Sequence, residues 1–334
     1  MTPRQPAESR SVPLPAQPGE DERGGPTYVS TFTELLRRGE FVVTAELNPP
    51  KSAAASVVRR RAGVLKGFVD AVNVTDSNRA VAAMAAIPAA VIVREAGLDP
   101  IVQMTGRDRN RIALQADLLG AAALGIEHFL FMSGDDPKQG NHPDAVNVKD
   151  LDGIGLVKMA ALMRDKAQFL SGDDIKQPPT YTIGATASPF TKPMEADLVK
   201  TVEKVTAGAD FLQTQPVFDL ATFSQWLAEV RRLAGRQVAI IAGVLVLRSS
   251  EQAERLGRVP GLALGPAVIE RLKKTEDEEA EGIAMAIEMV RSLRALPGVG
   301  GVHLYAIEWP EGVTKVVDGA GLHPRPKMKE SKSA

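Results

Sequence analysis

Short apolar runs recur eight times along the chain, and most of them end in a polar residue. They lie at residues 41–45, 71–74, 100–102, 128–132, 181–183, 211–214, 238–241 and 301–306. Segments with helical periodicity separate nearly all of them. Eight alternations of strand and helix are typical of a single-domain α/β fold, the (β/α)8 TIM barrel. In that fold the carboxyl ends of the strands meet at one mouth, so the polar residues that end the strands become candidate site residues.

The same pattern divides the chain into one folded domain and two tails. We expect the barrel over residues 29–322, with a short helix at 31–38 closing its bottom and Asp108 capping a helix over 108–124. Residues 1–28 are rich in proline and charged side chains, so we expect a disordered N-terminal tail. Residues 323–334 are mostly basic and polar, and we expect a flexible C-terminal tail.

Composition narrows the class of protein. The chain has 334 residues, 44% of them apolar, and a formal net charge of −1, which gives no electrostatic basis for a nucleic-acid partner. It has no cysteine, which removes disulfides, thiolate zinc sites and a cysteine nucleophile, and which is compatible with a cytoplasmic protein. The longest apolar run, 80–93, is shorter than the roughly 18 residues of a membrane span. We therefore expect no membrane association and interpret this run as a buried helix followed by a loop or strand.

Two carboxylates lie where predicted strands end. Glu46 is followed by Leu-Asn-Pro-Pro, a rigid turn that would hold the carboxylate in one place. Such a group can act as a general acid if burial raises its pKa; the alternative is a solvated turn residue. Asp135 follows Ser133 and Gly134, and the glycine would let the backbone approach a flat ligand closely. Asp135 could bind an amino-heterocycle or tune a cofactor, and the alternative is an ordinary turn aspartate.

Two further residues suit recognition of a ring. Gln215 ends the sixth strand, and its planar amide can both donate to and accept from the edge of a heterocycle. Phe218 could stack on a ring, although a core position is the alternative. The chain has only four histidines, and none falls at a predicted strand end, so we expect no metal site. No glycine-rich dinucleotide fingerprint is present.

At these positions the chain resembles the 5,10-methylenetetrahydrofolate reductase family. The resemblance runs in consistent order over roughly residues 40–322. It is carried by the segments 45–50, 72–75, 125–135, 196–198, 204–210, 214–219 and 298–305. No single segment would suffice, and the set is specific when taken together.

The resemblance implies a (β/α)8 barrel that holds FAD at its mouth. NADH or NADPH would reduce the flavin, which would pass the hydride to 5,10-methylenetetrahydrofolate and yield 5-methyltetrahydrofolate. In that scheme Glu46 matches the general acid, Asp135 the aspartate that contacts the pterin and tunes the flavin, and Gln215 the glutamine that recognises the folate. The positions that match flavin contacts are Thr75, Gln103, Ser133, Gly134, Asp197 and Lys204.

Departures from the family's pattern fall mostly on the flavin side. Ser133 stands where the family usually has arginine, Gln103 where it has histidine, and Glu203 where an arginine precedes the phosphate-binding lysine. Two phosphate-side cations are lost, and each charge-assisted contact is worth on the order of 1.5–3 kcal/mol. Four other cations are candidates to replace them: Arg79, Arg107, Arg109 and Lys192.

Two alternatives to the flavin mechanism stay open. The same reaction could proceed by direct hydride transfer from nicotinamide to folate. The loss of two cations that would bind the flavin diphosphate motivates this alternative. The chain could also be a folate-binding partner subunit without turnover of its own. A homo-oligomer is compatible with a barrel, but the sequence identifies no surface for one.

Overall fold

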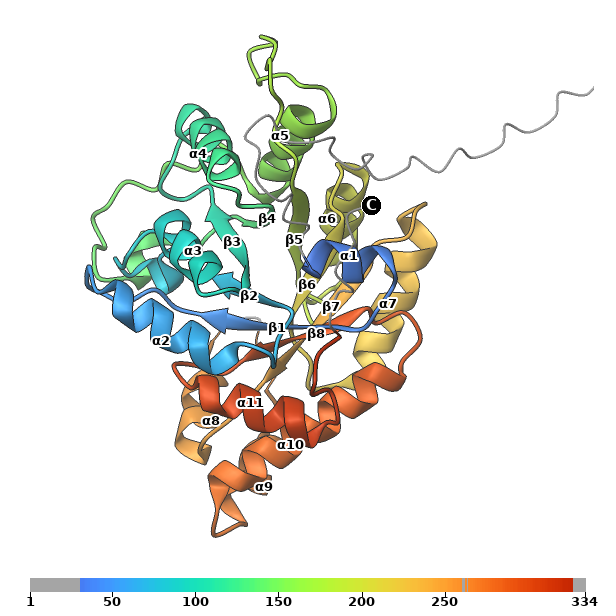
Figure 1. The fold of residues 1–334 in the computed structure, drawn as a ribbon. Helices are drawn as coiled ribbons and strands as arrows, with labels where there is room; N and C mark the ends of the chain where they lie inside the picture. The colour runs from blue at the N-terminus through green and yellow to red at the C-terminus, as the bar shows by residue number, and fades with distance from the viewer. Residues whose placement is uncertain (1–30, 260–261, 263, 327–334) are drawn as a thin grey trace, which may run out of the picture.

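The protein is a closed barrel of eight parallel strands surrounded by helices (Figure 1). The structure, a computed structural model, describes residues 31–259, 262 and 264–326. The strands are β1 Val42–Leu47, β2 Ala71–Val74, β3 Asp99–Thr105, β4 His128–Met132, β5 Thr182–Ala187, β6 Phe211–Pro216, β7 Ala239–Leu245 and β8 Gly301–Tyr305. They pair in chain order, and β8 closes the barrel on β1. The predicted (β/α)8 fold is confirmed. The tail expected at residues 1–28 lies outside the described residues.

The helices follow the predicted alternation, with differences at their ends. They are α1 Thr31–Arg37, α2 Ala55–Leu65, α3 Ala86–Glu95, α4 Arg111–Ala123, α5 Gly153–Asp165, α6 Met194–Thr206, α7 Leu220–Leu233, α8 Ser250–Leu256, α9 Pro266–Lys273, α10 Glu278–Ala295 and α11 Pro310–Gly319, with short turns η1 Asn78–Ala80 and η2 Pro137–Gln139. Helices α9 and α11 were not predicted. No helix in this described part of the chain is long and apolar enough to cross a membrane.

Two helix starts differ from the sequence-based expectation. Asn110, rather than Asp108, caps α4, because its side chain accepts hydrogen bonds from the main-chain N–H groups of Ile112 and Ala113. Asp108 is instead bound to Arg107. In the apolar run 80–93 the order is reversed, since a loop comes first and α3 begins at residue 86. Its proline, Pro88, lies in the first turn, where the missing N–H costs nothing.

The bottom of the barrel is filled by apolar side chains and closed by α1, as predicted. Phe32 and Leu35 of α1 pack against an inner layer made of Val42, Ala71, Ile101, Leu130, Phe211 and Ile241. Gly184 of β5 is required by this layer, because a Cβ there would overlap the Phe211 ring. The layer is fully buried and anchors the strand register below the mouth.

Above this layer the interior becomes polar. Side chains of a barrel strand alternate between the interior and the surrounding helices. Val42 therefore places Thr44 and Glu46 on the inner face of β1, and the same count applies to the other strands. The inner polar residues above the apolar layer include Asn73 on β2 and Thr75 directly after it, Gln103 and Thr105 on β3, Gln213 and Gln215 on β6, and His303 and Tyr305 on β8.

The lower rim is held by a buried ion pair between segments far apart in the sequence. Arg325 Nη2 lies 2.7 Å from Asp70 Oδ2, and the two side chains are 8% and 1% exposed. Asp70 also accepts a hydrogen bond from the main-chain N–H of Val43, and Arg325 donates to the carbonyl of Phe41. Arg325, in the expected flexible tail, therefore packs against the barrel, and the His323 ring beside it stacks on Phe68.

We predict that Arg325→Ala lowers the free energy of unfolding by about 3 kcal/mol, because it leaves the buried Asp70 carboxylate without its cation. Chemical denaturation monitored by circular dichroism measures this change. Arg38→Ala, which breaks an exposed pair with Glu34, is the matched control and should cost less than about 1 kcal/mol. Equal effects of the two variants would contradict the structural role of Arg325.

Candidate active site

Glu46 is a half-buried carboxyl group at the mouth. Its Oε1 accepts one hydrogen bond, from Asn48 Nδ2 at 3.2 Å. Burial raises the pKa of Glu46 to about 7, and the Asn48 hydrogen bond opposes this shift. A carboxyl group with this pKa carries its proton for much of the time near neutral pH, so it can serve as a general acid.

The turn after β1 is fixed by its neighbours. Asn48 Oδ1 accepts a hydrogen bond from Thr75 Oγ1 at 2.9 Å and a longer one from Asn78 at 3.4 Å. The carbonyl of Asn48 accepts a third, from Arg61 Nη1 at 2.6 Å. The donor that faces Glu46 is therefore held from three sides, and the position of the carboxyl group is fixed in turn.

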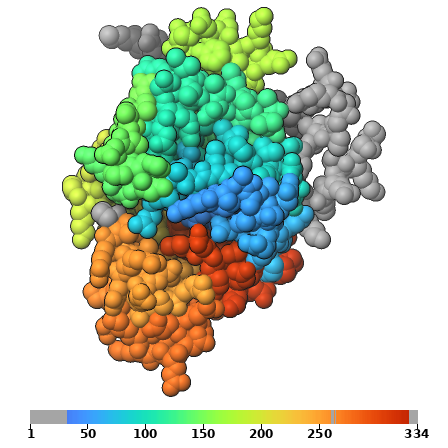
Figure 2. All heavy atoms as spheres, turned by 90° about the vertical axis from the view of Figure 1, so that its left-hand side faces the viewer, coloured from blue at the N-terminus to red at the C-terminus, as the bar shows by residue number. Residues whose placement is uncertain are grey.

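A small pocket opens beside Glu46, between the loops that follow β1 and β8. Its lining includes Glu46, Asn48, Arg61, Ala306, Glu308 and Trp309. Strand β1 ends on the left of Figure 1, on the side that faces the viewer in Figure 2, where the blue β1–α2 region meets the red β8–α11 region. Glu46 therefore lines a small pocket at the mouth.

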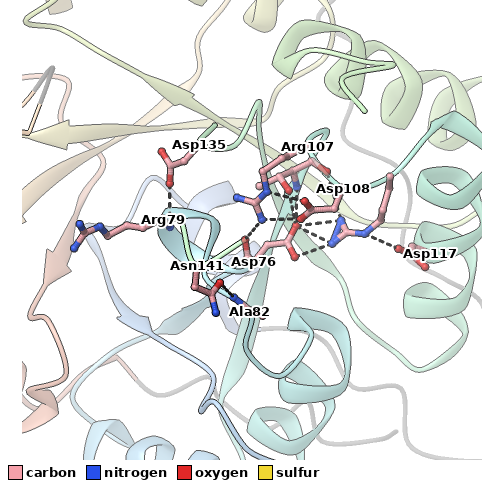
Figure 3. A network of polar contacts seen from close by, with 10 residues as sticks. Asp76, Arg79, Ala82, Arg107, Asp108, Asp117, Asp135 and Asn141 are labelled. Carbon is pink, nitrogen blue, oxygen red and sulfur yellow. Dashed lines mark hydrogen bonds and ion pairs between the residues drawn. The ribbon is translucent and has the colours of Figure 1, made fainter. Parts of the chain in front are cut away.

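Asp135 holds two loops together. Gly134 has a left-handed backbone (φ 84°), and Asp135, which is exposed, accepts a hydrogen bond at Oδ2 from the main-chain N–H of Arg79 at 3.0 Å (Figure 3). Asn141 Oδ1 binds the N–H of Ala82 in the same way. The loop after β4 thus clamps the loop after β2 across the end of β3.

The clamped loop is strained. Ser77, Arg79 and Ala80 have φ values of 48°, 56° and 55°, a region that residues other than glycine rarely adopt. Each such residue costs on the order of 1–3 kcal/mol and persists only where its surroundings impose it. The hydrogen bonds from Asp135 and Asn141 supply that constraint at the mouth.

Two of the four candidate replacement cations are already neutralised. Arg109 Nη2 lies 2.7 Å from Asp76 Oδ1 and also pairs with Asp117. Arg107 pairs with Asp108 at 2.6 Å, and its side chain is 3% exposed. Arg79 forms no ion pair with the described residues, and Figure 3 shows its guanidinium extending away from this network. Lys192 is exposed and likewise unpaired within the described part of the chain.

Several residues predicted to contact flavin already have protein partners. Asp197 accepts hydrogen bonds from the N–H of Ser188, from Thr201 Oγ1 and from Trp226 Nε1, at 3.0, 3.1 and 2.8 Å. Lys204 Nζ donates to the carbonyl of Thr186 at 2.6 Å, and burial lowers the pKa of this lysine.

The same is true of two shorter side chains. Ser133 Oγ accepts from the N–H of Gly153 at the start of α5. Thr75 donates to Asn48, as described above. These bonds join loops and helices of the barrel to one another, and the flavin contacts stay a prediction.

The remaining predicted residues have polar groups or ring surface that the described residues do not occupy. The side-chain amides of Gln103 and Gln215 form no hydrogen bond with other described residues, and Gln103 is 8% exposed. Phe218 packs on the cluster that contains Leu245 and is partly exposed. Glu46, Gln103 and Gln215 therefore combine inward-facing positions on three strands with unused hydrogen-bonding capacity. No group of three or more potential metal ligands occurs among the described residues.

Sequence reasoning missed three interior residues below the mouth. Asn73, Gln213 and Tyr305 are linked by hydrogen bonds across the barrel. The available signal was the two-residue alternation along β2, β6 and β8, which places them on the same face as Thr75, Gln215 and His303. Their mutual contacts could not be read from the sequence, because strands on opposite sides of a barrel meet only in the fold.

Comparison with known proteins identifies the family. The profile of the family described as "Methylenetetrahydrofolate reductase" matches residues 31–321. The chain belongs to this family. One relative is "Probable methylenetetrahydrofolate reductase (NADPH)" of Caenorhabditis elegans, 24% identical over 242 residues, which are 70% of this chain and 34% of that one. Another is the 5,10-methylenetetrahydrofolate reductase of Escherichia coli K12, 26% identical over 60% of this chain and 62% of its own length. This methylenetetrahydrofolate reductase family member thus spans about a third of the worm protein's length.

A solved structure shares the fold. It is an uncharacterised Clostridium thermocellum protein that binds two copies of 5-methyl-5,6,7,8-tetrahydrofolic acid. Its TM-score is 0.60 at 13% identity, and the match covers 86% of this chain and 96% of that chain. An F420-dependent secondary alcohol dehydrogenase matches with a TM-score of 0.54 at 11% identity, over 84% of this chain and 99% of its own. At these identities the likeness shows the barrel fold alone.

We predict that Glu46 makes the stability of the protein depend on pH. Its pKa is about 7 in the folded state against 4.5 for an unperturbed group. Since the folded state binds the proton more tightly, stability is lost as pH rises from about 4.5 to 7. Relative to Glu46→Gln, the wild type should lose on the order of 3 kcal/mol between pH 4 and pH 8, measured by denaturant titration at each pH. Parallel pH profiles of the two proteins would show that burial does not raise this pKa.

Proposed function

We propose that this protein reduces 5,10-methylenetetrahydrofolate to 5-methyltetrahydrofolate with a hydride from NADH or NADPH. The observation that carries the proposal is Glu46, a carboxyl group with a pKa of about 7 that faces the mouth beside a pocket. The chain's membership of the family supports the choice of folate.

The proposed chemistry needs one proton and one hydride. In the substrate a methylene group bridges N5 and N10. Glu46 protonates N10, the C–N10 bond breaks with its electron pair going to nitrogen, and an N5 iminium ion forms. The hydride adds to the iminium carbon and gives the N5-methyl group, and Glu46 regains its proton from water. The Gln215 amide, which forms no hydrogen bond with other described residues, can recognise the pterin edge, and Phe218 offers a partly exposed ring.

The residues available for FAD fit that cofactor poorly. A flavin dinucleotide is held by cations or main-chain N–H groups at its diphosphate and by polar partners along its ribityl chain. Arg107 and Arg109 are committed to carboxylates, and Asp197 and Lys204 to protein donors and acceptors. Glu203, at the position of a family cation, pairs with Lys158 at 2.7 Å. This occupancy supports direct hydride transfer from nicotinamide to the folate, in preference to a flavin-borne hydride.

We predict that Glu46→Gln reduces the rate of folate reduction by about 10²- to 10⁴-fold, because it removes the proton donor. Binding of NADH or NADPH, measured by the fluorescence of the reduced nicotinamide, should stay within about twofold of wild type. Glu311→Gln alters an exposed carboxylate in the first turn of α11 and is the control. An unchanged turnover in Glu46→Gln, or an equal loss of nicotinamide binding, would rule out Glu46 as the acid.

The flavin question has its own test. We predict that the protein purified without added flavin is colourless and catalyses folate reduction by NADH or NADPH in that state. The measurements are the visible absorption spectrum and the turnover of the same sample. Flavin absorbance with FAD released on denaturation, and activity proportional to the FAD bound, would contradict direct transfer. Folate binding without any turnover would instead favour a non-catalytic partner subunit.

A further inference from the structure

A chain of hydrogen bonds crosses the barrel just below the mouth. Asn73 Nδ2 on β2 donates to Gln213 Oε1 on β6 at 2.8 Å, and Gln213 Nε2 donates to the hydroxyl of Tyr305 on β8 at 3.3 Å. The Tyr305 hydroxyl donates to the main-chain carbonyl of Thr214 at 3.1 Å. Asn73 and Gln213 are 0% and 2% exposed, so bulk water does not compete for these groups.

This series of hydrogen bonds can run in only one direction, which the main-chain carbonyl of Thr214 fixes. The Thr214 carbonyl can only accept a hydrogen bond, so the Tyr305 hydroxyl must donate its single proton there. The Tyr305 oxygen is then the acceptor for the Gln213 NH₂ group. This orientation turns the Gln213 side-chain carbonyl toward Asn73, which must therefore donate a hydrogen bond to it from its own NH₂ group. The orientation of both amides thus follows from chemistry and does not rest on how their nitrogen and oxygen atoms are assigned.

The free end of this chain is an acceptor. Asn73 Oδ1 is buried and has no hydrogen-bond partner in the described part of the chain. A buried carbonyl left without a donor costs roughly 1–3 kcal/mol, so the site favours any neighbour that can donate.

Glu46 is that neighbour. Glu46 and Asn73 are direct partners in the β1–β2 ladder, and both face the barrel interior. An ionised carboxylate can only accept hydrogen bonds, whereas a protonated carboxyl group can donate one. The acceptor on Asn73 therefore complements the protonated form of Glu46 alone.

The other polar groups around Glu46 do not reverse this preference. On β8, burial lowers the pKa of His303 to about 3 and raises the pKa of Tyr305, so both are neutral near pH 7. Arg61 and Glu308, which line the adjoining pocket, lie 3.9 Å apart and offset each other, and Arg61 is bound to the Asn48 carbonyl. Asn48 is the one described group that donates to the Glu46 carboxylate.

We propose that Asn73, oriented by Gln213 and Tyr305, is the hydrogen-bond acceptor that keeps Glu46 protonated. Tyr305 is then a positioning residue, because it acts on the acid through two amides. The consequence for catalysis rests on the proposed function, but the protonation of Glu46 can be tested without turnover.

The test is the pKa of Glu46 in Tyr305→Phe. Without the hydroxyl, the side-chain amides of Gln213 and Asn73 can flip and exchange the positions of their nitrogen and oxygen atoms. Asn73 can then present its NH₂ group to Glu46 and stabilise the carboxylate. We expect the pKa of Glu46 to fall by about one pH unit, the equivalent of one hydrogen bond. The pKa is measured from the infrared carboxyl band of Glu46 over a pH titration. In each protein this band is identified by its loss when the Glu46→Gln substitution is combined with the other variant.

Two further variants keep the result decisive. Asn73→Ala removes the acceptor and admits water, and should lower the pKa of Glu46 as well. Thr44→Val is the matched control. It removes another interior hydroxyl, which is hydrogen-bonded to His303 Nδ1 at 2.8 Å and does not belong to the hydrogen-bond series of Asn73, Gln213 and Tyr305. Thermal unfolding by circular dichroism verifies that each variant is folded.

A pKa of Glu46 that is unchanged in folded Tyr305→Phe and Asn73→Ala would overturn the inference. So would an equal fall in Thr44→Val. If the wild type reduces no folate, the proposed function fails, while the infrared titration still decides whether Asn73 holds the proton on Glu46.

Discussion

A carboxyl group withdrawn from water at the mouth of the barrel is the constraint on which the rest of the site depends. Ionised, Glu46 would lose hydration that one hydrogen bond from Asn48 does not replace, so its pKa rises to about 7. The neighbouring contacts fix the surroundings of this carboxyl group. Thr75 and Arg61 hold Asn48 in place, and Asn73, the partner of Glu46 in the β1–β2 ladder, presents a hydrogen-bond acceptor.

Charge elsewhere at the mouth is arranged to cancel. The buried side chains of Asp76 and Arg107 form a polar network with the partly exposed Arg109 and the exposed Asp108 at the ends of β2 and β3 (Figure 3). Such ion pairs fix the geometry of the loops and leave little net charge for a ligand. Arg79, in the loop that Asp135 holds, forms no ion pair with the other described residues. Among the described residues, the mouth therefore offers an acid, neutral amides and few unpaired cations, an arrangement consistent with the proposed folate reduction.

Much of this could be predicted from the sequence, because strand ends in a barrel converge whatever the details of packing. The repeat of apolar runs predicted the fold and placed Glu46 and Gln215 at the mouth. The assignment of Asp197 and Lys204 to flavin could not be judged in the same way, since a residue type that matches a family does not reveal whether Trp226 or Thr186 already occupies its polar atoms. Tyr305 was missed because its role depends on a cross-barrel partner.

The most direct test follows the hydride. The protein is given 5,10-methylenetetrahydrofolate in ordinary water, together with NADH or NADPH that carries deuterium at the reactive C4 position. The mass of the product is then determined by mass spectrometry. The account predicts 5-methyltetrahydrofolate with one deuterium in nearly every methyl group, because the hydride passes directly between the two substrates. An unlabelled methyl group would mean that the hydride travels through a carrier whose proton exchanges with water, and the absence of product would mean that the protein binds folate without reducing it. Either result would contradict the account.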